Sequence, residues 1–224
     1  MKLHHLTRKA RTCLQPASWM ALLLPMLCAA QSDWPNKTIH FIVPFSAGGA
    51  NDLMGRAAAE GAAKALGQTV VVDNRPGAGG SLGASIVAKS APDGYTFLIS
   101  AAGTISNTMI KPSVPYKDDD LLPVALIALA PSMVVVPHHS KYQNLKDFVE
   151  ASRAGNGFNF ATAGSGSTPH FVAEILNVKY GAKLQPVPYK SGSESTTAVM
   201  GGQVEGTSEA SIIALPHILH DGKF

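Results

Sequence analysis

Short apolar runs alternate with segments of helical periodicity along this chain. Phe41 to Val43 stops at Pro44, and after a loop that holds Gly48-Gly49 the chain becomes Ala-rich, with small or apolar residues every four positions from Leu53 to Ala65. The pattern predicts a strand, a tight turn and a helix that ends at Gly67. A loop of this kind directs the first free N–H groups of the helix beyond the strand's carboxyl end, where an anion is favoured.

The alternation continues to residue 107. Val70 to Val72 and Tyr95 to Ile99 read as strands, and a Gly-rich turn over residues 73–80 leads into a helix between them. The small, polar residues 100–107 have the composition of a loop that backs a ligand. The order strand, helix, strand, helix, strand predicts an α/β sheet.

The next part of the chain is more irregular. The apolar runs Val124 to Ala130 and Met133 to Val136 are predicted strands. Asn144 and Asp147 resemble a capping box, which predicts a helix that Gly155 closes.

A second strand, Gly-rich loop and helix follow. Phe158 to Ala161 is the strand, residues 162–168 are the loop, Thr168 is the predicted N-cap, Pro169 suits the first helical turn, and Gly181 ends the helix. The unit has the same parts as the first one and therefore predicts a second helix start that favours an anion. Shorter helices are predicted at residues 193–200 and 211–220.

The first 30 residues differ from the rest. They carry four basic residues and no acid, then an apolar run at residues 19–27 that is too short to span a bilayer, then Cys28-Ala29-Ala30. These features predict a secretory signal peptide cleaved after Ala30. Lipid attachment at Cys28 is the alternative, although the bulky Leu27 before it does not favour that reading.

The positive net charge of the sequence and both of its cysteines come from this leader. Of 18 basic and 15 acidic residues, 14 and 15 remain after residue 30, so the net charge is −1 and gives no reason to expect nucleic acid or a membrane surface as partner. Cys13 and Cys28 also leave with it, so the exported chain is held by its core rather than by disulfides.

No metal or catalytic motif is evident. Asp118 to Asp120 lack the alternating acids, Gly and later Glu of a calcium loop, and His138-His139 lack a third ligand at a suitable spacing. We therefore predict neither a cofactor nor enzymatic activity.

A collinear set of motifs runs from about Trp34 to Lys223. The motifs resemble those of the Bug-type periplasmic substrate-binding proteins of tripartite tricarboxylate transporters. They are IVPFSAGGAND at 42–52, VVDNRPGAGG at 71–80, APDGYT at 91–96, PVAL at 123–126, residues 161–170, VPYK at 187–190, GGQV at 201–204 and LPH at 215–217.

The resemblance implies a two-lobe Venus-flytrap fold of the periplasmic-binding-protein type. Residues 31–107 would form the N-terminal part of lobe one, residues 108–220 lobe two, and residues 221–224 the start of the crossover back to lobe one. The C-terminal part of lobe one would then be missing, and the sequence is expected to be truncated at its C-terminus.

The resemblance also implies a ligand clasped between the lobes by loop backbone and hydroxyl groups. The ligand would be a small organic acid: a di- or tricarboxylate, an amino acid or an aromatic carboxylate. The protein would be a periplasmic monomer that delivers it to the membrane subunits of a tripartite tricarboxylate transporter. The residues expected at the ligand are Ser46, Gly48, Gly49, Ala102, Thr104, Asn107, Ser165, Gly166, Ser167, Thr168 and His170.

The chain departs from the family pattern after Gly201. Glu205 stands where many members have Asp, and the stretch Gly206 to Ala210 is more polar than the expected apolar strand. Glu209 falls where the family often has an acid; facing the cleft, it would disfavour additional ligand carboxylates or recognise an amino group. Ala101 and Ala102 replace commoner hydroxyl residues.

Three alternatives remain open. Asp73, at the end of the second strand, suits a dinucleotide-dependent enzyme, but the first loop lacks G-x-G-x-x-G. Ser165 or Ser167 with His170 suggests a hydrolase, but the loop does not fit G-x-S-x-G. The glycines could also be turn-formers alone, which would make the chain a remnant that binds nothing.

Overall fold

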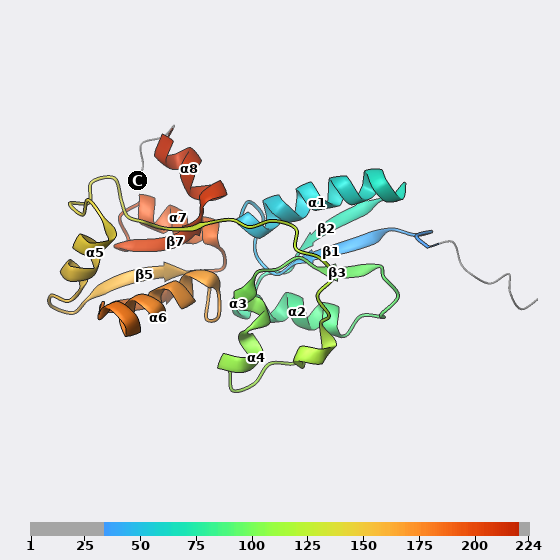
Figure 1. The fold of residues 1–224 in the computed structure, drawn as a ribbon, viewed down its shortest axis with the longest axis horizontal. Coiled ribbons are helices and arrows are strands. Elements are labelled where there is room, and N and C mark those ends of the chain that lie inside the picture. Colours follow the sequence, from blue (N-terminus) through green and yellow to red (C-terminus); the bar gives the residue numbers. More distant parts are fainter. Residues whose placement is uncertain (1–33, 220–224) are drawn as a thin grey trace, which may run out of the picture. The chain divides into compact units, whose positions relative to one another are not determined.

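The computed structural model describes residues 34–219, and Figure 1 shows their elements. The predicted leader, Cys28 and the predicted crossover at residues 221–224 lie outside the described residues. The first part holds β1 (Ile39–Val43), α1 (Ala50–Leu66), β2 (Val70–Asn74), η3 (Ala78–Gly80), α2 (Ser81–Ala88), β3 (Thr96–Leu98), α3 (Ala102–Ile105), α4 (Asn107–Ile110) and η4 (Asp118–Asp120). It is followed by β4 (Ser132–Val135), α5 (Leu145–Ser152), β5 (Phe158–Thr162), α6 (Thr168–Tyr180), β6 (Leu184–Pro188), α7 (Gly192–Met200), β7 (Gly206–Ala210) and α8 (Ser211–Leu219).

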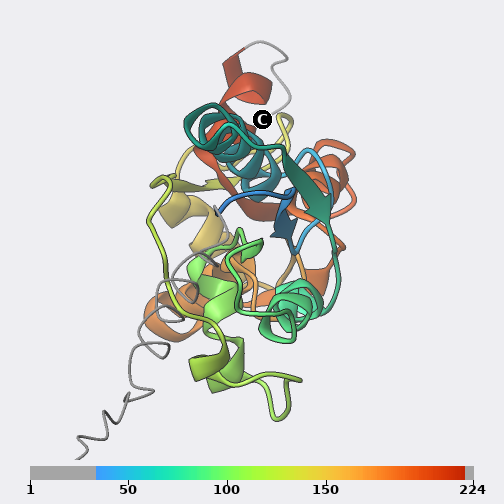
Figure 2. The same cartoon turned by 90° about the vertical axis from the view of Figure 1, so that its right-hand side faces the viewer.

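The first sheet is parallel, in the order β2-β1-β3. Its central strand carries the buried side chains Ile39, Ile42 and Val43, and Pro44 ends it. Helices α1 and α2 cover opposite faces of this sheet, as both views show (Figures 1 and 2). The predicted α/β arrangement of residues 39–99 is confirmed.

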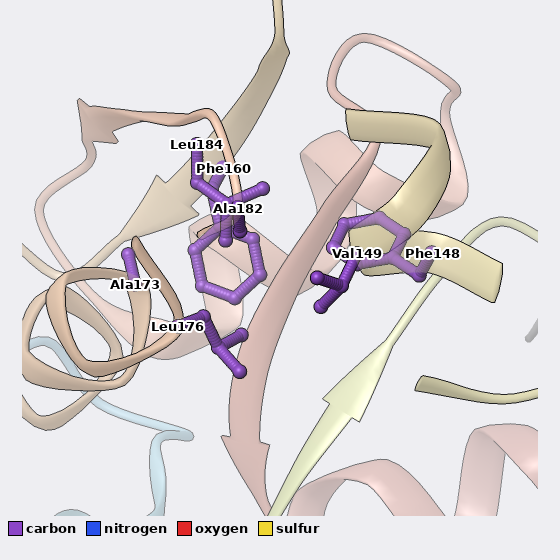
Figure 3. Close-up of a cluster of buried hydrophobic side chains, with 7 residues drawn as sticks. All are labelled: Phe148, Val149, Phe160, Ala173, Leu176, Ala182 and Leu184. Carbon is purple, nitrogen blue, oxygen red and sulfur yellow. The ribbon is translucent and has the colours of Figure 1, made fainter. Parts of the chain in front are cut away.

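The second sheet has the order β4-β7-β5-β6, and only β4 is antiparallel to its neighbour. Side chains of β5 alternate between its faces, so Phe160 packs with Phe148 and Leu176 of α5 and α6, while Ala161 packs with Val199 of α7. Figure 3 shows the first of these clusters. Both sheets belong to one compact unit that begins at Lys37.

The structure corrects several element predictions. Residues 124–130 form no strand, because nothing in the described chain pairs with them, and Leu126 and Leu129 are 76% and 85% exposed. Residues 102–110 contain the short helices α3 and α4 rather than only a loop, and β6 was not predicted. The N-cap of α6 is Ser167, not Thr168.

The polar strand β7 is accommodated by hydrogen bonds. The Thr207 hydroxyl donates to the Ala161 carbonyl oxygen at 2.7 Å, and the hydroxyls of Ser208 and Ser132 lie 2.7 Å apart. Because these buried groups have partners, the strand can be polar without a large desolvation penalty.

Candidate functional site

A cavity of about 790 Å³ lies where several helices begin. Its walls include the first turn of α1, the start of α3, the first turn of α6, the first residue of α7 and the end of β7. No Lys, Arg or His lines it. The lining residues are Phe45, Gly49, Ala50, Asn51, Met54, Ser100, Ala101, Ala102, Thr104, Ile105, Pro123, Val124, Ala125, Leu126, Ala128, Leu129, Ala130, Ser132, Ala163, Ser167, Thr168, Pro169, Gly192, Ser208, Glu209 and Ala210.

Helix α1 meets the cavity with its N-terminus. Its N-cap is Gly49, which has no side chain to accept a hydrogen bond from the first turn. The Gly49 carbonyl oxygen already accepts the first intrahelical bond, from Leu53 N–H at 3.0 Å. The N–H groups of Ala50 and Asn51 therefore lack both an intrahelical and a capping acceptor beside the cavity.

Helix α6 also begins at the cavity. Its N-cap Ser167 makes no capping hydrogen bond, although serine usually does so at this position, and its buried hydroxyl has no partner. The Ser167 carbonyl oxygen accepts the N–H of Phe171 at 3.1 Å. The first turn of α6 is thus uncapped by side chains, like that of α1.

The two helix starts place partial positive charge beside the cavity. Each helix terminus carries about half an elementary charge, and its free N–H groups are hydrogen-bond donors. The buried hydroxyls of Ser100 and Thr104 also lack partners, and both residues line the cavity. The arrangement suits a small anion held by backbone N–H and hydroxyl groups.

The loop before α1 is held in place by Asp52, which the sequence did not single out. This carboxylate, 3% exposed, accepts hydrogen bonds at 3.0 Å from Gly48 N–H, Arg56 Nε and Asn74 Nδ2. Burial by itself raises the pKa of the carboxyl, but the hydrogen bonds from Arg56, Gly48 and Asn74 outweigh it and hold the pKa below its ordinary value.

Replacing this acid, Asp52→Asn, is expected to lower the free energy of unfolding at pH 7 by about 2 kcal/mol, because a charge-assisted network is lost. A pKa that is depressed in the folded state means that the stabilisation is complete above about pH 4 and is lost as the pH falls further. The gap between the melting temperatures of wild type and variant should therefore narrow in acid.

The matched control is Asp93→Asn. Asp93 is also paired, with Lys37 at 2.9 Å, but its side chain is 40% exposed. The Asp93→Asn variant should have a melting temperature close to that of the wild type. Equal effects of the two changes, or a gap that stays constant down to pH 3, would contradict the role given to Asp52.

Glu209 is the one acid in the cavity wall. It lies on β7, is 8% exposed, and its Oε1 accepts the N–H of Ala210 at 2.8 Å. Burial raises the pKa of Glu209, and the Ala210 N–H and the Thr196 hydroxyl offset this only in part. Glu209 lies in the wall of the cavity, and its contact with a ligand stays a prediction.

The structure brings half of the expected ligand residues to the cavity and leaves the rest nearby. The lining includes Gly49, Ala102, Thr104, Ser167, Thr168 and Glu209. The lining does not include Ser46, Gly48, Asn107, Ser165, Gly166 and His170. Asn51 and Ser100 were missed, although both follow the carboxyl ends of parallel strands, which could have indicated them.

Several residues outside the wall have structural contacts instead. Asn107 Nδ2 donates to the Gly79 carbonyl oxygen at 3.0 Å, and its side chain lies against Gly166. His170 Nδ1 accepts the N–H of Gly166 at 3.4 Å. These contacts shape the loop before α6.

The enzymatic alternatives gain no support from the geometry. No hydrogen bond joins His170 to Ser165 or Ser167, and the Nδ1 of His170 already accepts the N–H of Gly166. Asp73 faces His40, with Oδ2 3.3 Å from Nδ1. Within residues 34–219 no three His, Cys, Asp or Glu side chains are grouped to bind a metal, and none of the helices there has the length and hydrophobicity needed to cross a bilayer.

Residues 54–224 match the family model described as the tripartite tricarboxylate transporter family receptor. The chain is 37% identical over 174 residues to the UPF0065 protein in the tcbD-tcbE intergenic region of Pseudomonas sp. strain P51, covering 77% of this chain and 52% of that one. It is 36% identical over 189 residues to protein BugT of Bordetella pertussis, covering 83% of this chain and 58% of BugT.

The fold is similar to that of solved periplasmic binding proteins. MatC from Rhodopseudomonas palustris, solved with bound malate, superposes with a TM-score of 0.79 at 30% identity, over 84% of this chain and 65% of MatC. The chain therefore has the periplasmic-binding-protein fold over the part that it shares, and it spans between about half and two-thirds of these relatives.

Proposed function

The chain belongs to the tripartite tricarboxylate transporter receptor family, and from this premise we propose that it is a solute receptor for a small organic carboxylate. The observation that carries the proposal is the convergence of two uncapped helix starts, those of α1 and α6, on one cavity. The carboxylate would accept hydrogen bonds from their first turns and from the hydroxyls of Ser100, Thr104 and Ser167.

The expected interaction free energies allow a carboxylate to bind without a basic side chain. Each helix start contributes about 0.3–1 kcal/mol to an anion, and each hydrogen bond to a charged group about 1.5–3 kcal/mol. Three or four such bonds and two helix starts total about 5–14 kcal/mol, and at most about 10 kcal/mol remains once an association cost of about 4 kcal/mol or more is subtracted, a range that includes millimolar and micromolar binding. The malate bound by MatC is a carboxylate of the appropriate class.

The remaining walls suit the organic part of the ligand. Phe45, Met54 and Ile105 line the cavity together with the apolar residues of the segment 123–130 other than Ile127. Burial of CH₂ groups against such walls favours binding by about 0.8 kcal/mol each. The ligand would therefore have a short apolar body behind its carboxylate.

The cellular setting follows from the family and the leader. The protein would be exported through residues 1–30, act in the periplasm as a monomer, and deliver its ligand to the membrane subunits of a tripartite tricarboxylate transporter. It would bind and release this ligand unchanged, because the site combines donors for an anion with no nucleophile and base in contact.

The proposal is tested by thermal melts with malate, succinate, adipate, benzoate and glutamate, each beside the corresponding amide. At a hundred times its dissociation constant, a ligand adds about 2.7 kcal/mol to the free energy of unfolding. At least one acid should raise the melting temperature by about 5–10 °C, and its amide should not. A melt that no carboxylate shifts would contradict the proposal and favour a chain that binds nothing.

A further inference from the structure

Glu209 is the acidic residue in the cavity wall, whereas the helix starts carry partial positive charge. Its place on β7 is fixed by the pairing of Glu209 with Met133 of β4 and by burial to 8% exposure. It lines the same cavity as Gly49 and Ser167, the N-caps of α1 and α6. The cavity therefore combines donors for an anion with one buried carboxyl group.

Glu209 has no cationic partner in the described chain. None of the Lys, Arg or His residues between 34 and 219 forms an ion pair with it. Its Oε1 accepts one backbone N–H, from Ala210, and the Thr196 hydroxyl also interacts with the carboxyl group. Its Oε2 lies against Gly192, the first residue of α7, where any Cβ atom would overlap it. Gly192 thus leaves the space that this carboxyl group occupies.

A buried carboxylate with no cationic side chain beside it is unfavourable, and burial raises the pKa of Glu209 although its carboxyl group lies at the start of α7. A positively charged group brought in by a ligand would relieve this. A second carboxylate brought to the same place would be repelled at short range and in low dielectric, where like charges oppose each other strongly.

On the premise of the proposed function, we propose that Glu209 determines specificity: it selects ligands that carry an amino group in addition to the carboxylate held at the starts of α1 and α6. The site then recognises an amino acid or an amino-substituted carboxylic acid in preference to a plain mono- or dicarboxylate. Specificity arises from attraction of the amine and repulsion of a second acid at one residue.

The test compares ligand pairs that differ by the amine alone. Aspartate with succinate, glutamate with glutarate, and 4-aminobutyrate with butyrate are titrated into the wild-type chain by calorimetry. In at least one pair the amino compound should bind about tenfold tighter or more. Glu209→Gln keeps the shape of the side chain and should remove that preference while retaining binding of the plain acid.

Glu205→Gln is the matched control. Glu205 is close in sequence, but it accepts the N–H of Asn159 at 2.7 Å and does not line the cavity. This variant should keep the amine preference of the wild type.

The possible outcomes separate the role of Glu209 from the proposed function as a carboxylate receptor. Equal binding within every pair would overturn the role of Glu209 and leave the carboxylate receptor intact. Tighter binding of the dicarboxylate, lost in Glu209→Gln, would show a neutral Glu209 that donates to a second acid, and would also overturn it. If no compound of either kind binds, the proposed function itself fails. Even where a variant does not fold, equal binding or tighter binding of the plain acid by the wild-type chain would overturn the role of Glu209.

Discussion

Gly49→Asp is expected to abolish carboxylate binding and leave the fold intact. The backbone at Gly49 is extended, and a Cβ atom there would have Ser46 O as its nearest neighbour, at an ordinary 3.6 Å. Aspartate is a preferred N-cap, so its side chain would accept the free N–H groups of Asn51 or Asp52. The new carboxylate would then occupy the anion position at α1 and repel a second one.

The expected readout is a melt that no longer responds to ligand. The stabilisation of about 2.7 kcal/mol at a hundred times the dissociation constant should vanish, while the ligand-free melting temperature stays within about 2 °C of wild type or rises slightly. Gly61→Asp places the same charge on the same helix, where a side chain would meet nothing within 4 Å. That control should keep its response to ligand; an unchanged response in Gly49→Asp would mean that α1 does not hold the anion.

Gly79→Ala is expected to destabilise the protein by about 3 kcal/mol or more. Gly79 has a φ of +60°, which L-residues adopt at a cost, and an added Cβ would overlap the Ser165 carbonyl oxygen. The same glycine accepts a hydrogen bond from Asn107 through its carbonyl oxygen. Alanine would therefore push residue 79 away from the loop that precedes α6, and the melting temperature should fall by about 6 °C or more.

Gly67→Ala is the control that measures the cost of the positive φ without a steric overlap. Gly67 ends α1 with a φ of +65°, and a Cβ there would meet nothing within 4 Å. Its cost should be limited to about 1–2 kcal/mol. If both variants melted alike, the close contact between Gly79 and Ser165 would not exist in solution.

The helix starts were predictable because each follows a local pattern. An apolar run, a Gly-rich loop and a helix recur at residues 41–67 and 158–181, and parallel strands in either sheet place such loops at their carboxyl ends. The pattern thus predicted both helix starts, and the resemblance implied Gly49, Ser167 and Thr168, which all line the cavity.

The features that could not be predicted from the sequence depend on contacts between residues that are distant along the chain. Asp52 and Arg56 are four residues apart and could be paired on a helix, but Asn74 reaches Asp52 only through the pairing of β1 with β2. The apolar segment 124–130 predicts a strand, yet a strand needs a neighbour, and the described chain supplies none. The sequence marked residues 206–210 as too polar for the strand expected there, because the partners of Thr207 and Ser208 lie on other strands.

The most direct measurement is a titration of the ¹⁵N-labelled chain with the acid that stabilises it most, beside the amide of that acid. The proposed function predicts that the amide resonances of Ala50, Asn51, Thr168 and His170 shift together on addition of the acid and do not shift with its amide. Resonance shifts confined to other parts of the chain, or the same shifts with acid and amide, would contradict a carboxylate held between the starts of α1 and α6.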